Sequence, residues 1–207
     1  RAESSTFFGR EIGLMYVHAH LRWAEALAHL GEADAFFAAL QQAQPIGIRE
    51  VVAAARPRQA NCYYSSSDAD VADRGEAAAR YADIRAGKVP LEGGWRVYSS
   101  GAGIAFRLIH ECFLGLRRGS TELGIDPVVP TALDGLEAEV DFDGRPLRLR
   151  YRIAARGFGP TRATLNGIEL PLRRGTNPYR EPGVFVPLAA VRAGMQPDAN
   201  VLEIALG

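Results

Sequence analysis

The sequence predicts a chain in which helices come first and β-strands follow, an α-then-β fold. Up to about residue 119, apolar residues recur at spacings of three and four, which is typical of helices that bury one face. Beyond residue 119, apolar and polar residues alternate as in half-buried strands, and the dipeptides Asp143-Gly144 and Asn166-Gly167 are strong hairpin signals. This order indicates two segregated parts, residues 1–119 and 120–207, rather than alternating strands and helices.

The first two helices are expected to pair as an antiparallel hairpin. Apolar residues at helical spacing predict one helix over Glu11–Gly31, and Gly31 supplies its stop. A second helix is expected over Ala33–Gln44, because acidic residues stand near its start and Pro45 follows its end. A connection this short makes the two helices antiparallel neighbours.

Two further helices and one long loop are expected before residue 119. Glu76–Ala86 can form a short helix between two glycines, and Gly103–Leu116 forms a strongly apolar one. Residues 52–73 are rich in Asn, Tyr, Ser and Asp and predict an irregular loop. Loops longer than about 12 to 15 residues inside a compact domain are usually functional or disordered, and the tyrosines of this loop favour a function.

Five or six strands are expected after residue 119. Two hairpins form around the Asp-Gly and Asn-Gly dipeptides, and two more strands follow. The expected strands cover Leu136–Phe142, Leu147–Ile153, Ala163–Leu165, Ile168–Leu172, Val184–Val186 and Val201–Leu206.

Composition excludes several classes of protein. Of the 207 residues, 47% are apolar and 23% charged, which is ordinary globular composition. Lys plus Arg and Asp plus Glu both number 24, and a chain of zero net charge gives no support to a nucleic-acid partner. Cys62 and Cys112 form neither a disulfide framework nor a zinc site. The chain begins at Arg1 with no signal-peptide pattern, so we expect a processed product or part of a longer chain.

His18 is the first candidate for chemistry. His18 and His20 lie two positions apart on the first helix and cannot face one point, whereas His18 and Arg22 can. Two interpretations remain open. The histidine is either a buried residue satisfied by a backbone or acidic partner, or an anion-binding or proton-handling group at the entry to a cleft.

The segment Gly93–Gly103 is the second candidate. It opens the fourth helix with small residues, the hydroxyls of Ser99 and Ser100, and free backbone N–H groups, which together make a ready anion site. The alternative is a capped helix start with Ser99 or Ser100 as the N-cap. The segment is neither a Walker loop nor a dinucleotide fingerprint.

The loop from Arg58 to Asp68 is the third candidate, because it combines amides and aromatic rings. Carbohydrate sites use rings for sugar faces and amides for hydroxyls, although a plain polar loop stays open as an alternative. The aspartates of this region lack the spacing of an EF-hand, so no metal is expected. No nucleophile elbow occurs either.

Four ordered elements together resemble the C-terminal region of the inverting glycoside phosphorylases of glycoside hydrolase family 94. They are Tyr16–Arg22 (YVHAHLR), Arg58–Asp68 (RQANCYYSSSD), Gly93–Gly101 (GGWRVYSSG) and Ile125–Pro130 (IDPVVP). The set is specific through its order and spans about residues 8–153. Within the family it is most similar to the 1,2-β-oligoglucan phosphorylases, with the phosphorylase-like region of cyclic β-1,2-glucan synthase second.

The resemblance implies a fold. Residues 1–119 would be the last helices of an (α/α)6 barrel catalytic domain, and residues 120–207 a small antiparallel β-sandwich. The family's phosphate-binding His falls on His18, and its Thr-Gly pair falls on Ser99 and Ser100, where the first serine keeps the hydroxyl and the second still offers a backbone N–H. The general acid, an aspartate, is expected before Arg1.

Further residues are expected to contact sugar: Gln59, Asn61, Trp95 and Arg96. The implied partners are a β-glucan oligosaccharide, inorganic phosphate as co-substrate, the N-terminal part of the same enzyme and, if the enzyme is a homodimer, a second copy. No cofactor is implied. The implied location is cytoplasmic, or the cytoplasmic face of the inner membrane for a cyclic glucan synthase. A non-catalytic carbohydrate-binding module and a purely structural fragment stay open as alternatives.

Overall fold

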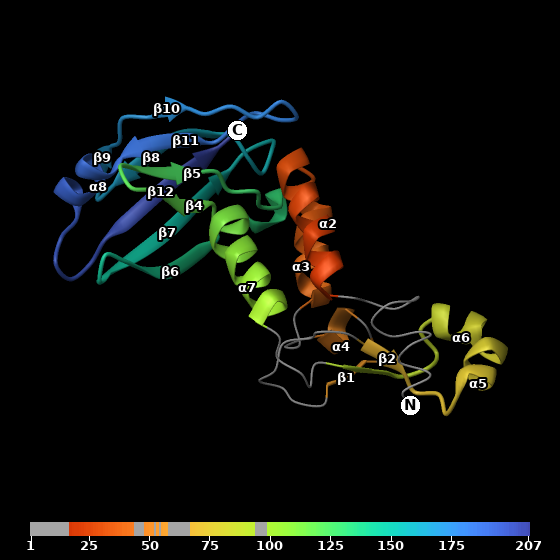
Figure 1. Ribbon diagram of the computed structural model, residues 1–207. Coiled ribbons are helices and arrows are strands. Elements are labelled where there is room, and N and C mark those ends of the chain that lie inside the picture. The colour runs from red at the N-terminus through yellow and green to blue at the C-terminus, as the bar shows by residue number, and fades with distance from the viewer. Residues whose placement is uncertain (1–16, 44–47, 52, 54, 58–66, 94–98) are drawn as a thin grey trace. The chain divides into compact units, whose positions relative to one another are not determined.

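The computed structural model describes residues 17–43, 48–51, 53, 55–57, 67–93 and 99–207. Helices come first and the two larger β-sheets follow, which confirms the predicted α-then-β order (Figure 1). By compactness the chain divides into two units. The described parts of 1–24 and 38–106 form the first, and 25–37 with 107–207 form the second. The functional division into 1–119 and 120–207 stays a prediction.

The predicted helical hairpin is present as α2 (Val17–Leu30) and α3 (Ala33–Ala43). Both helices bury one stripe, because their small and apolar residues recur at helical spacing. Gly31 joins them with φ of +83°, a conformation that an L side chain rarely adopts. Residues 11–16 and 44 of the two predicted helices lie outside the described residues.

The region between α3 and α7 is more regular than predicted. It contains α4 (Ile48–Val51), β1 (Ala55–Pro57), β2 (Ser67–Ala69), α5 (Arg74–Ala79), α6 (Tyr81–Arg85) and β3 (Leu91–Gly93). The strands form one sheet, in which β1 pairs parallel and β2 antiparallel with β3. The irregular loop predicted over 52–73 is wrong where β1 and β2 occur. These strands could not be recognised in the sequence because three residues are too few to show alternation.

The third and fourth predicted helices are also corrected. The helix predicted over 76–86 breaks at Arg80, whose φ of −102° and ψ of 17° end α5. The fourth helix, α7 (Ser99–Arg107), begins before the predicted Gly103 and continues as a π-helical turn, η1 (Leu108–Phe113). Gly115, with φ of +73°, then reverses the chain, so the predicted end at Leu116 is too late.

The second unit holds two larger sheets. The four-stranded sheet has the order β10 (Arg173–Arg174), β11 (Val184–Pro187), β5 (Glu122–Ile125), β4 (Leu116–Arg118). The five-stranded sheet has the order β6 (Glu137–Phe142), β7 (Arg145–Ile153), β12 (Val201–Leu206), β8 (Pro160–Leu165), β9 (Ile168–Glu169). The turn η2 (Thr131–Leu133) and the helix α8 (Leu188–Gly194) complete the unit. Both predicted hairpins, β6–β7 and β8–β9, are confirmed.

The prediction of an entirely antiparallel β-sandwich is wrong at one strand. The last strand, β12, lies between β7 and β8 and pairs parallel with β7, from Val201 beside Arg148 to Leu206 beside Ile153. It pairs antiparallel with β8, so the sheet is mixed. The chain reaches this position because a crossover through β11 and α8 precedes β12, whereas only adjacent hairpins are visible in the sequence. Strands β4, β5 and β10 and helix α8 were not predicted.

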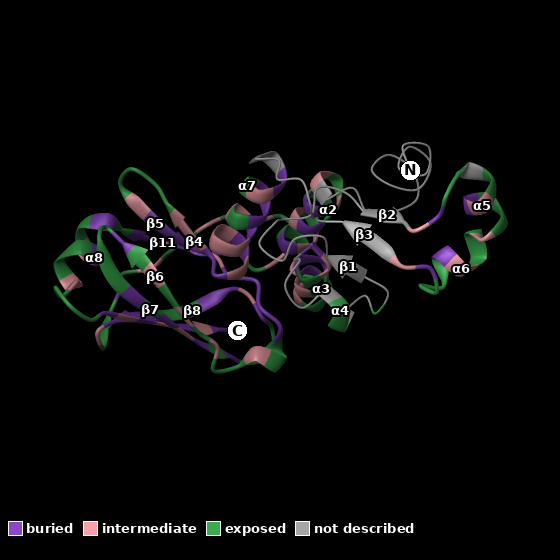
Figure 2. Ribbon diagram, turned by 90° about the horizontal axis from the view of Figure 1, so that it is seen from below, coloured by how far each residue is buried: buried purple, intermediate pink, exposed green. Residues whose placement is uncertain are grey.

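The core of the second unit lies between its two sheets, whose buried residues form one cluster. Figure 2 shows buried residues along strands of both sheets. On β7 alternate residues point inward, ending at Tyr151 and Ile153. Tyr151 is fully buried, and its hydroxyl donates a 2.6 Å hydrogen bond to the Leu114 carbonyl. An (α/α)6 barrel is not shown by the described helices and stays a prediction.

Candidate functional site

His18 and His20 have different surroundings on α2. The Nε2 of His20 donates a 2.7 Å hydrogen bond to the Ala39 carbonyl, and its ring lies 5.5 Å from that of Trp23. His20 therefore ties α2 to α3 in the manner of a structural histidine. His18, two positions earlier, is half-buried and faces elsewhere around the helix.

Ser99 and Ser100 are the first two residues of α7. The first four N–H groups of an α-helix have no acceptor within the helix, so both residues offer main-chain donors at its positive end. No acidic residue stands in the first turn of α7 to occupy this end. Both serines lie inside the first turn of α7, so the sequence-based alternative of an N-cap serine is replaced by a position within the helix.

The other predicted site residues, Gln59, Asn61, Trp95 and Arg96, lie outside the described residues. The structure therefore neither joins them to His18 nor separates them from it. Among the described residues no cluster of His, Cys, Asp and Glu has the arrangement of a metal site. None of the described helices is both long and apolar enough to cross a membrane.

An ion pair joins α2 to α7. Nη2 of Arg107 lies 2.6 Å from Oε1 of Glu25, and the side chains are 34% and 18% exposed. Burial lowers the pKa of the Arg107 guanidinium, but the hydrogen bond and charge of Glu25 outweigh it and the pKa is raised. The guanidinium is therefore charged at any ordinary pH. Sequence analysis did not identify it, because the partners are far apart in the chain.

The π-helical turn η1 follows this ion pair directly. It closes where the Leu114 N–H donates to the Ile109 carbonyl at 2.7 Å. Such turns are rare and occur often near functional sites. Cys112 within it is buried, and burial raises the pKa of its thiol despite Arg117 at 3.8 Å. The thiol is therefore protonated at neutral pH and is a poor nucleophile.

A second ion pair lies inside the second unit, next to the C-terminal end of α2. Arg180 donates to both carboxylate oxygens of Asp126 at 2.8 and 3.0 Å, and its Nε donates to the Ala28 carbonyl at 3.1 Å. Asn177 likewise donates to the His29 carbonyl at 3.1 Å. The carbonyls at the end of α2, which lack intrahelical donors, are thus satisfied by the loop before β11. Asp126 belongs to the Ile125–Pro130 element and has a structural role here.

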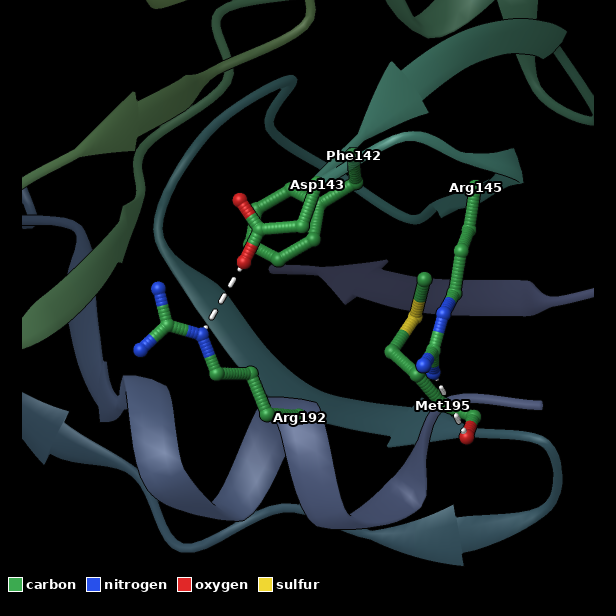
Figure 3. A pocket seen from close by; sticks show the side chains of 5 residues that line it. All are labelled: Phe142, Asp143, Arg145, Arg192 and Met195. Atoms are coloured by element: carbon green, nitrogen blue, oxygen red, sulfur yellow. Dashed lines mark hydrogen bonds and ion pairs between the residues drawn. The ribbon is translucent and has the colours of Figure 1, made fainter. Parts of the chain in front are cut away.

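A small pocket opens on the second unit (Figure 3). Its volume is about 190 Å³, and its lining is Phe142, Asp143, Arg145, Arg192 and Met195. Arg192 donates to Asp143 at 3.0 Å, and Arg145 donates to the Met195 carbonyl at 3.3 Å. Both arginines are therefore engaged by the protein itself. Ligand pockets are usually larger, about 300 to 1,000 Å³. No residue predicted for the site lies here.

Among the described residues, His18 lies on α2, Ser99 and Ser100 begin α7, and Arg180 and Asn177 contact the end of α2. No family model matches the chain. Over 187 residues, 90% of its length, the chain is 42% identical to a 1,2-β-oligoglucan phosphorylase of Listeria innocua serovar 6a. The aligned part is 17% of that relative, so the chain spans about a sixth of its length. The chain is thus related in sequence to part of a glycoside phosphorylase.

Proposed function

We propose that the chain is the phosphate-binding part of a glycoside phosphorylase that acts on β-1,2-linked glucan. The reaction is reversible phosphorolysis to glucose 1-phosphate with inversion at the anomeric carbon. The observation that carries the proposal is the 42% identity to a 1,2-β-oligoglucan phosphorylase along 90% of the chain. Membership of glycoside hydrolase family 94 and an (α/α)6 barrel belong to the same proposal.

Phosphate is bound in this proposal by His18, Ser99 and Ser100. Support comes from the position of both serines at the start of α7, where N–H groups without an acceptor inside the helix and the helix dipole favour an anion. Support also comes from α2, which has no acidic residue in its first turn beside His18. An imidazole N–H and hydroxyls would complete the coordination of the oxyanion, and hydrogen bonds to an anion are charge-assisted.

The sugar is held in this proposal by Gln59, Asn61, Trp95 and Arg96. Amide and guanidinium groups suit the hydroxyls of a glucosyl unit, and an indole ring suits its apolar face. The roles are assigned from residue chemistry and from the resemblance of the two segments to the family.

The proposed mechanism follows from the charge of the nucleophile. Phosphate is an anion at neutral pH and attacks the anomeric carbon without a general base. The protein must hold it on the face opposite the leaving oxygen while an acid protonates that oxygen. We assign the acid to an aspartate in the part of the enzyme before Arg1. No cofactor enters the reaction, whose co-substrate is inorganic phosphate.

Two alternatives are kept. The chain could belong to the phosphorylase-like region of a cyclic β-1,2-glucan synthase at the cytoplasmic face of the inner membrane, instead of a cytoplasmic phosphorylase with a possible homodimer. It could also be a carbohydrate-binding module without catalysis. The named relative favours the phosphorylase over both.

The test is phosphorolysis by the full-length protein that carries this chain. With β-1,2-glucooligosaccharide and inorganic phosphate, the proposal expects release of α-glucose 1-phosphate, and with β-1,3- or β-1,4-linked oligomers much less. Binding of the glucan without phosphate-dependent cleavage would favour the carbohydrate-binding module and contradict the proposal.

A further inference from the structure

We propose that the Glu25–Arg107 ion pair is a positioning pair that sets the register of α2 against α7 at the phosphate site. The inference rests on the proposed function, because it concerns the same site. Its structural basis is independent, since it follows from the contact between two helices and from helix geometry.

The first step is a spacing shared by both helices. His18 stands seven residues before Glu25 on α2, and Ser100 stands seven before Arg107 on α7. Seven residues of α-helix turn through about 700°, within about 20° of two full turns, and rise about 10.5 Å. Position 18 therefore shares a helix face with Glu25, and position 100 with Arg107.

The second step is the direction of the helices. The end of α2 is held by Arg180 and Asn177 of the second unit, and the end of α7 runs through η1 into β4. Within the second unit, Arg180 joins the Ala28 carbonyl of α2 to Asp126, and the Asp126 N–H donates to the carbonyl of Gly115, just after η1. The C-terminal ends of α2 and of α7 with η1 therefore lie near the same residue, and the two helices run the same way (Figure 1). Positions 18 and 100, each two turns before the ion pair, are therefore expected to lie on the faces of α2 and α7 that are turned toward each other. Ser99 lies about 100° further round α7.

The third step concerns the strength of the contact. Glu25 borders the buried stripe of α2 formed by Leu21, Ala24 and Ala28. At 2.6 Å and 18% exposure its carboxylate is screened less by water than a surface pair would be. Other charged groups also face the pair: His29 lies 4.0 Å from Glu25, and Glu111 lies 3.6 Å from Arg107. The His29–Glu25 and Arg107–Glu111 pairs each join residues four positions apart in the chain, whereas the Glu25–Arg107 contact joins α2 to α7.

The kinetic test compares Glu25→Gln with Glu111→Gln in the full-length protein. Both changes replace a carboxylate on Arg107 by an amide, but only the first breaks the contact between helices. We expect Glu25→Gln to raise the KM for phosphate about tenfold and to change the KM for glucan less than twofold, while Glu111→Gln changes neither. The exchanged pair Glu25→Arg with Arg107→Glu should restore the phosphate KM to within about threefold of the wild type.

The geometric test needs no activity. In the full-length protein with its native cysteines replaced, Cys62→Ser and Cys112→Ala among them, His18→Cys and Ser100→Cys are joined by a thiol cross-linker of about 8 Å, the separation of packed helices. His20→Cys with Ser100→Cys is the matched control, since position 20 lies about 200° round α2. We expect efficient cross-linking for 18–100, little for 20–100, and a severalfold lower 18–100 yield after Glu25→Gln.

The outcomes separate the two proposals. Equal 18–100 yields with and without Glu25→Gln would overturn the positioning role. A lower yield with an unchanged KM for phosphate would show that the ion pair orders the two helices but that phosphate does not bind between them. The proposed role at the phosphate site would then be overturned. Absence of phosphorolysis by the wild-type protein, together with the expected cross-linking of the cysteine variants, would defeat the proposed function alone.

Discussion

The side chain of Arg180 is 2% exposed and forms a bidentate ion pair with Asp126, with distances of 2.8 and 3.0 Å. Its Nε donates a hydrogen bond to the Ala28 carbonyl at the end of α2. The two residues are 54 positions apart in the chain. One guanidinium therefore links three parts of the second unit: Asp126 after β5, the loop before β11 and the end of α2.

Asp126→Asn should destabilise the protein by about 3 kcal/mol, because it leaves the buried Arg180 charge uncompensated. Urea denaturation measures the loss. Glu122→Gln is the matched control, since its 2.7 Å pair with Arg173 is exposed and contributes less than about 1 kcal/mol. Equal effects of the two changes would show that Arg180 is not a structural anchor.

Tyr151→Phe should cost about 1 to 2 kcal/mol, because it leaves the Leu114 carbonyl without its 2.6 Å donor inside the core. Burial raises the pKa of the Tyr151 hydroxyl, so the folded protein keeps its proton when the unfolded chain loses it. The contribution of the Tyr151 hydroxyl to the free energy of unfolding is therefore complete below a pH of about 10. Above that pH it falls by about 1.4 kcal/mol per pH unit. Denaturation between pH 8 and 11 should show a shallower decline for Tyr151→Phe, and identical slopes would refute the role of burial.

Gly157→Ala should destabilise the second unit by at least about 3 kcal/mol, because an added Cβ would meet the Val129 carbonyl oxygen at 1.6 Å and the backbone must move. Gly103→Ala provides the control. Its Cβ meets nothing within 4 Å on α7, so helix propensity predicts a gain of about 0.5 to 1 kcal/mol. Melting temperatures should move in opposite directions.

Part of the fold could be predicted because its signals are local. The Asp143-Gly144 and Asn166-Gly167 turns fix two hairpins, and both Asp143 and Asn166 have positive φ, of 55° and 52°. The boundaries of β12, Val201–Leu206, agree with the alternation. The parallel pairing of β12 could not be predicted, since a pattern of alternation says nothing about which strand lies beside it.

The site was predictable only in part. Sequence placed His18 on a helix and the two serines at the opening of another, and the structure has them on α2 and at the start of α7. The π-helical turn leaves no sequence signal, because Leu108–Phe113 has the apolar spacing of an ordinary helix end. The contacts of Glu25 with Arg107 and of Asp126 with Arg180 depend on folding across 82 and 54 residues.

His18→Ala should raise the KM for phosphate at least about tenfold and leave the KM for glucan nearly unchanged, since a charged hydrogen bond contributes about 1.5 to 3 kcal/mol. Initial rates at varied phosphate and varied glucan measure both constants. His20→Ala is the control. It removes the 2.7 Å bond to Ala39 and should lower stability without affecting phosphate. Equal increases of both constants for His18→Ala would reject the assignment.

The most direct measurement is a crystal of the full-length protein soaked in tungstate, which replaces phosphate and is located by its anomalous scattering. The account predicts one strong peak within hydrogen-bonding reach of the His18 ring and the first N–H groups of α7. If that position is vacant and tungstate binds instead at a different pocket, one that glucan also occupies, the account is contradicted.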